Sequence, residues 1–129
     1  MLILVRGSML FNRVPMGIAT IDVAFNQDVK AMEIDDAVTS EFLLFQLSAS
    51  ESRIPINETG IGAGKIELDD LKRLEVYVPA PTEQRAITAC LTNFDNMITA
   101  ETQKLAALKT HKHGLMQQLF PATAEAADL

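Results

Sequence analysis

The sequence is poor in cysteine, with Cys90 alone, and it has one tyrosine and no tryptophan. A single thiol cannot form an internal disulfide, nor supply the several cysteines of a zinc site. We therefore expect a reducing, cytoplasmic environment. The opening residues 1–5 are apolar, but this run is too short for a membrane span. No charged stretch precedes it, as a secretory signal would need, so we expect no membrane association.

Positive charge is also scarce. The 129 residues carry 17 acidic and 11 basic side chains, a formal net charge of −6. This balance argues against tight autonomous binding to nucleic acid, because neutralisation of phosphates dominates such affinity. It leaves room for a local basic surface. The hydrophobic content of 48% is enough for one domain with a real core.

Apolar patterning predicts the first elements. Leu2 to Val5 is predicted as a short buried strand, closed by a turn at residues 6–8. Alternation over residues 21–31 predicts a half-buried strand with a kink near Gln27. A core helix follows, capped by Thr39 or Ser40 and carrying an apolar cluster over residues 42–47.

Serine, proline and glycine then dominate residues 48–64, which we predict as a loop. A strand resumes at residues 65–68, Asp69 caps one helical turn, and a further strand covers residues 74–78. Thr82 caps the long helix that comes next. The predicted fold class is α+β: a small mixed β-sheet domain with a core helix, followed by a long C-terminal coiled-coil helix. The domain covers residues 1–81, the helix residues 82–121, and a disordered tail residues 122–129.

The long helix has apolar residues at steps that alternate strictly between four and three. Such a repeat of 3.5 residues specifies a narrow seam that packs against another helix in a left-handed supercoil. Eight of its ten positions are apolar. The seam consists of Ile87, Leu91, Phe94, Ile98, Glu101, Leu105, Leu108, Lys112, Leu115 and Leu119.

Two charged residues interrupt the seam and suggest how a partner helix lies. In an antiparallel pair of identical helices, Glu101 of one copy can face Lys112 of the other. In the same register Leu105 faces Leu108, Ile98 faces Leu115, and Phe94 faces Leu119. A buried charge without a partner is costly, whereas a paired one can fix the register. We therefore expect an antiparallel homodimer through these residues. In the alternative, Glu101 and Lys112 extend to solvent at a rim and the helix packs on its own domain.

The sequence resembles the end of a target-recognition domain and the conserved spacer helix of type I restriction-modification specificity subunits. The resemblance covers nearly the whole chain and is most specific from Leu68 to Phe120. In the first part it is carried by residues 2–7, 13, 23–29 and 42–44. In the second part it is carried by Pro79, Pro81, Glu83, Gln84, Ile87, Leu91, Asp95, Leu105, Leu108, Lys112, Leu115, Met116, Gln118, Leu119 and Phe120.

This resemblance implies a non-catalytic subunit that directs methyltransferase subunits, and sometimes restriction subunits, to a bipartite DNA sequence. Such subunits usually hold two recognition domains and two antiparallel spacer helices in one chain. This sequence offers one helix and one domain, whose front is expected to be missing. A homodimer would supply the second helix. The alternative is a truncated remnant that serves only as a coiled-coil dimerisation or assembly module without reading DNA.

Cations in or beside turns are the candidates for DNA contact, because loops on a rigid scaffold commonly carry binding residues. We rank Arg6, Arg13 and Lys65 first, with Ser8 as a hydrogen-bonding neighbour; Lys30 and Arg53 are further cations. For each of them the alternative is ordinary solvated surface charge. No catalytic residue, metal ligand or cofactor is predicted: His111 and His113 lie about 200° apart around the helix, and the glycines of residues 60–64 fit a flexible loop.

Overall fold

The computed structural model describes residues 1–60 and 62–120. The chain divides into two compact units, Met1–Ala89 and the part that begins at Cys90. The predicted tail at residues 122–129 lies outside the described residues. The α+β class is confirmed. The single mixed sheet is not, because every strand pair is antiparallel and the strands form two sheets of three.

The first sheet has the order β3-β1-β4. Its central strand β1 (Leu2–Leu4) pairs with β3 (Met16–Gly17) on one side and with β4 (Val29–Ala31) on the other. Both neighbours run antiparallel to β1. They therefore run parallel to each other at opposite edges, and the chain between them must cross from one edge to the other.

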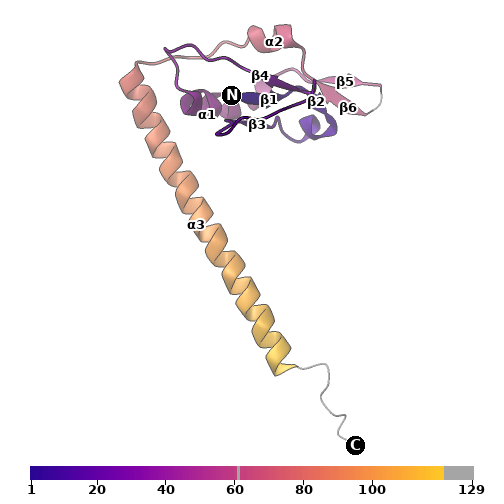
Figure 1. Ribbon diagram of the computed structural model, residues 1–129, viewed down its shortest axis with the longest axis vertical. Helices are drawn as coiled ribbons and strands as arrows, with labels where there is room; N and C mark the ends of the chain where they lie inside the picture. The colour runs from indigo at the N-terminus through magenta and orange to yellow at the C-terminus, as the bar shows by residue number, and fades with distance from the viewer. Residues whose placement is uncertain (61, 121–129) are drawn as a thin grey trace, which may run out of the picture. The chain divides into compact units, whose positions relative to one another are not determined.

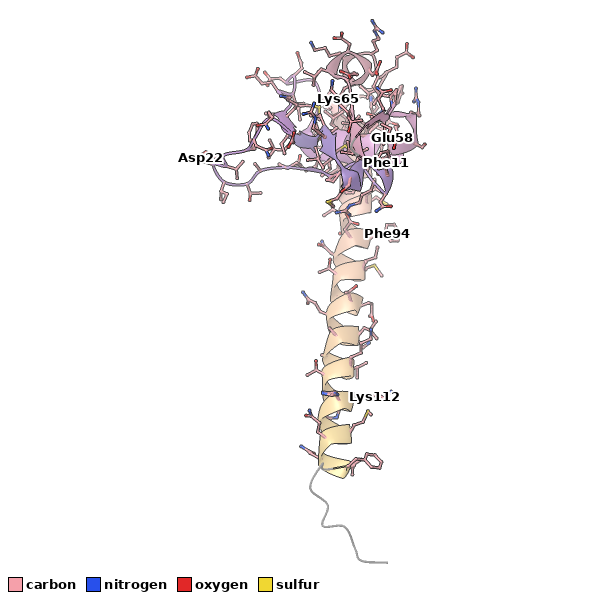
Figure 2. The ribbon with its side chains drawn as sticks, turned by 90° about the vertical axis from the view of Figure 1, so that its right-hand side faces the viewer. Phe11, Asp22, Glu58, Lys65, Phe94 and Lys112 are labelled. Carbon is pink, nitrogen blue, oxygen red and sulfur yellow. The ribbon has the colours of Figure 1, made fainter. Side chains whose placement is uncertain are left out.

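The prediction of a strand over residues 21–31 was wrong except at its end. Only Val29–Ala31 forms a strand, and the preceding residues serve as the crossover. Ile21 is 75% exposed, and Val23 and Phe25 are about half exposed. Figure 2 shows Asp22 at the outer end of this loop. The alternation is real, but these residues do not join the sheet as a further strand beside β3 or β4.

The second sheet has the order β2-β6-β5. Here β2 (Arg6–Gly7) and β5 (Asn57–Thr59) both pair with the central strand β6 (Ala63–Lys65). Val5 alone separates β1 from β2, so the chain passes directly from one sheet to the other (Figure 1). The predicted turn at residues 6–8 was therefore wrong: strand β2 occupies its first two residues, and a 3-10 helix, Ser8–Phe11, starts at its third.

A hairpin occupies part of the predicted loop at residues 48–64. β5 and β6 form it, and a 3-10 turn, Glu51–Arg53, precedes it. The strand therefore ends at Lys65 rather than beginning there. The core of the unit lies where these segments meet. It consists of Ile3, Val5, Leu10, Val14, Ile54 and Ile66.

Helix α1 (Ser40–Ala49) confirms the predicted helix and its cap. The Thr39 hydroxyl accepts a hydrogen bond from the Phe42 N–H at 3.3 Å. Phe42 and Leu47 are buried, while the apolar residues between them are half-buried. The helix is thus covered on most sides over residues 42–47, as expected for a core helix.

Helix α2 (Leu68–Lys72) is the predicted helical turn, although its cap residue is Glu67 rather than Asp69. The strand predicted at residues 74–78 does not form. That segment is irregular, and its carbonyl at Tyr77 accepts a hydrogen bond at 2.8 Å from the side chain of Gln46 on α1. A side chain, rather than a neighbouring strand, therefore satisfies the backbone there.

Helix α3 (Pro81–Leu119) runs for 39 residues and passes Gly114 without a break. The Ala80 carbonyl accepts from the N–H groups of Glu83 and Gln84, so the helix begins after Ala80 and the predicted Thr82 cap was wrong. Pro81 occupies the first helical position, where its missing N–H costs nothing and its fixed φ suits a helix.

Candidate nucleic-acid interface

Two cations face each other across the second sheet. Arg6 on β2 lies directly opposite Lys65 on β6, so both side chains lie on the same face of the sheet. Like charges in this arrangement repel and destabilise the strand pair. Lys65 is partly neutralised, because its Nζ lies 2.7 Å from Glu67 Oε1. Arg6 is exposed and forms no ion pair with another described residue. An anion bound here would relieve the repulsion.

The pair lines a cleft of about 480 Å³. Its walls come from β2, β4, β6, α2 and the turn before β4. Figure 2 labels Lys65 within this first unit. Four cations and three carboxylates line the cleft, so its surface is mixed in charge with a small positive excess. They are Arg6, Lys30, Lys65 and Lys72, and Asp28, Glu67 and Asp69.

The structure brings together only two of the four residues predicted to contact DNA. Arg6 and Lys65 meet in the cleft, whereas Ser8 and Arg13 are exposed outside its lining. Lys30, named among the further cations, also lines the cleft. Lys72 was missed, because it ends a short helical turn and nothing in the sequence places that turn beside β6.

The part of the chain that the structure describes holds neither a group of metal ligands nor a helix suited to cross a membrane. Within residues 1–60 and 62–120, no three His, Cys, Asp or Glu side chains gather as metal ligands. In the same ranges, no helix is both long enough and apolar enough to cross a membrane.

Comparison with known proteins decides the family. Residues 9–110, well over half of the chain, match the family described as "Type I restriction modification DNA specificity domain". The chain belongs to this family. The sequence is also similar to the "Type I restriction enzyme MjaVIII specificity subunit" of Methanocaldococcus jannaschii, with 25% identity over 92 residues. The match covers 71% of this chain and 22% of that relative, so the chain spans only a small part of the relative's length. No solved structure matches.

In this specificity-domain chain, the second unit presents the predicted seam on α3. Figure 2 marks two of its members, Phe94 and Lys112. Six apolar side chains of the seam are between 43% and 72% exposed, which is unusual for large apolar groups at regular spacing. Met97 and Met116, at positions flanking the seam, add to the exposed apolar surface. The six are Phe94, Ile98, Leu105, Leu108, Leu115 and Leu119.

Proposed function

We propose that this specificity-domain chain is a non-catalytic subunit that recognises a DNA sequence in the cytoplasm. It acts in a type I restriction-modification system and directs methyltransferase and restriction subunits to a bipartite site. Family membership supports recognition of DNA in general. The observation that carries the proposal for this chain is the placement of Arg6 opposite Lys65 in an open cleft.

Phosphate contact explains the arrangement of these cations better than surface solvation does. Two cations in adjacent strands repel each other in the free protein, and a phosphate between them removes the repulsion. The strands hold both backbones in fixed register, so the backbone loses little freedom on binding. Ser8 and Arg13 would then extend the contact beyond the cleft as separate, exposed contributions.

A homodimer through the seam supports recognition of a bipartite site. In the antiparallel register, Glu101 faces Lys112 of the second copy at two equivalent places, and the small residues Ala106 and Ala107 lie at the centre. The two-fold axis of such a dimer relates the two recognition domains. The two half-sites would then be related by the same symmetry.

The alternative function is an assembly module that dimerises without reading DNA. The three carboxylates in the cleft and the net charge of −6 favour it, because both weaken attraction for phosphates. The two proposals differ in the DNA contact that they expect of this chain. As a recognition subunit, the chain binds DNA, and the methyltransferase strengthens that binding. As an assembly module, the chain contributes no DNA contact.

A salt titration of DNA binding separates the two proposals. Binding of a fluorescent random-sequence duplex is followed by anisotropy at several salt concentrations, with and without the methyltransferase subunit of the same system. Recognition through cations gives a dissociation constant that rises with salt, with a slope that counts the phosphates neutralised.

The substitutions Arg6→Ala and Lys65→Ala are then compared with Arg53→Ala, which removes an exposed cation outside the cleft. If the first two variants alone bind DNA more weakly than wild type, the result supports the cleft as the DNA-binding site. A complete lack of binding by the wild-type chain, even with the methyltransferase, favours the assembly module.

A further inference from the structure

The turn that precedes β4 places Gln27 in the lining of the cleft. Asn26 Oδ1 accepts a hydrogen bond from the Asp28 N–H at 3.1 Å, and the Asn26 carbonyl accepts from the Val29 N–H at 3.2 Å. These bonds define a tight turn stabilised by the Asn26 side chain. Gln27 lies between Asn26 and Asp28, at the first central position of the turn.

This turn is fastened to the core beside the cation pair. The Asp28 carbonyl accepts a hydrogen bond from the Val5 N–H at 2.7 Å, and Val5 is 6% exposed. Val5 immediately precedes Arg6 in the chain. The turn that carries Gln27 is therefore hydrogen-bonded, through Asp28, to the residue directly before Arg6. The backbone of Gln27 is thus held beside the cation pair, while its side chain is exposed to a ligand.

Some of the polar side chains near Gln27 already have partners, whereas its own amide has none. Asn26 Nδ2 lies 3.4 Å from Asp28 Oδ2, so these two side chains are engaged with each other. Lys65 is paired with Glu67. The Gln27 side chain is exposed, lines the cleft, and forms no hydrogen bond with another residue in the described ranges 1–60 and 62–120. Its amide thus offers one acceptor and one donor group side by side to a ligand.

A glutamine amide can donate to a phosphate, but its paired donor and acceptor are used together only by a base edge. A phosphate oxygen accepts hydrogen bonds only, which suits Arg6 and Lys65. A glutamine amide pairs in a bidentate way with adenine, donating to N7 and accepting from the N6 amino group. Cations for the backbone therefore lie in the same cleft as one amide suited to a base edge.

We propose that Gln27 is a specificity-determining residue that reads one adenine in the half-site, while Arg6 and Lys65 anchor the neighbouring phosphates. This inference rests on the proposed function, because it requires that the cleft binds DNA. The side chain that discriminates between bases then lies on a turn that alternation in the sequence does not predict.

Selection of bound duplexes from a random-sequence library tests the inference. The full-length chain with its methyltransferase subunit is used as wild type, as Gln27→Ala, as Gln27→Glu, and as the matched control Gln103→Ala, which removes an exposed amide of α3 outside the seam. We expect the wild type to select sites with adenine at one particular position. Gln27→Ala should accept any base at that position, with a loss of discrimination of about tenfold to a hundredfold. Gln27→Glu should shift the preference towards cytosine, whose N4 amino group donates to a carboxylate. For Gln27→Ala the salt slope of duplex binding should not change, because no charge is added or removed.

The outcomes separate the two proposals. A selected motif that is the same for wild type and Gln27→Ala overturns the role of Gln27 but leaves the proposed function in place. A wild-type protein that selects no motif contradicts the proposed function, and the role of Gln27 fails with it. Equal relaxation by Gln103→Ala would show that the effect does not depend on the cleft, and would also overturn the inference.

Discussion

At the scale of single residues, Gln84 connects two segments of the first unit through a side chain that is 1% exposed. Its Oε1 accepts from the Thr39 N–H at 3.1 Å, and its Nε2 donates to the carbonyls of Ala37 at 2.8 Å and Pro79 at 2.9 Å. Gln84 stands in the first turn of α3, and Thr39 caps α1. The amide therefore ties the start of one helix to the start of the other.

Loss of this amide should destabilise the first unit. In Gln84→Ala, one backbone N–H and two carbonyls lose their partner in bonds that are buried or partly buried, at a cost of about 1–3 kcal/mol for a buried unsatisfied group. We expect the free energy of unfolding in urea to fall by about 2–4 kcal/mol, since several groups and some packing are lost together.

The exposed amide of Gln103 supplies the control for this change. Gln103→Ala should leave stability within about 0.5 kcal/mol of wild type. Equal stability of the Gln84→Ala variant and wild type would show that water replaces the amide without cost.

Arg6 illustrates a residue whose removal should weaken binding without weakening the fold. It faces Lys65 across the strands, so Arg6→Ala removes a repulsion and should change the free energy of unfolding by no more than about 0.5 kcal/mol. The same variant should reduce the salt slope of DNA binding by about one, because one phosphate contact is lost. Thermal unfolding and the anisotropy titration measure the two effects on one preparation. A substantial loss of stability together with the loss of binding would instead give Arg6 a structural role.

At the scale of elements, the sequence predicted those whose signal is local. Helix α1 follows from its cap and apolar cluster, and α3 follows from uninterrupted periodicity after Pro81. Strands depend on partners that lie elsewhere in the chain, so alternation over residues 21–27 and 74–78 predicted strands that do not form. For the site, turn positions pointed to Arg6 and Lys65, but only the register between β2 and β6 shows that they meet. Gln27 and Lys72 join them through tertiary contacts that no local pattern reveals.

Gly64 belongs to a strand that the glycine content of the sequence led us to predict as a loop. Together with Gly60 and Gly62 it suggested a flexible loop, yet it lies buried in the central strand β6. A Cβ at this position would lie 2.8 Å from Ile56 Cγ2 and 2.9 Å from Leu10 Cβ. Glycine inside a strand is a known sign of such close approach. The strand needs glycine here for space, rather than for an unusual backbone conformation.

Gly64→Ala should therefore destabilise the second sheet. Forcing a methyl group into this packed position costs about 1–3 kcal/mol, because Leu10 is buried in the core and Ile56 packs against that core. The midpoint of urea unfolding should fall accordingly. Gly17→Ala in β3 is the matched control, since a Cβ there meets nothing within 4 Å and should be neutral or slightly stabilising. Equal effects of the two substitutions would contradict the packing argument.

At the scale of the whole molecule, the exposed seam of α3 is the feature that most requires an explanation. Within one chain Glu101 lies 3.7 Å from Lys104, an exposed pair of the kind that contributes little to stability. Glu101 is therefore free to exchange this partner for Lys112 of a second copy. The apolar positions on either side would be covered in the same register, which gives the two interruptions of the seam a purpose that neither has in a single chain.

Exchange of the two charges tests that register. In the proposed antiparallel dimer, Lys112→Glu places two carboxylates opposite each other at both equivalent contacts, and Glu101→Lys does the same with two ammonium groups. Each single variant should raise the dimer dissociation constant about tenfold or more in sedimentation equilibrium. The double variant Glu101→Lys with Lys112→Glu restores opposite charges at both contacts and should recover most of the wild-type affinity. Gln103→Glu, which adds a carboxylate away from the seam, should have little effect. A wild-type monomer at high concentration rules out the dimer. A double variant as weak as the single ones allows a dimer but excludes this register, because recovery depends on the two charges facing each other and on nothing else in the helix.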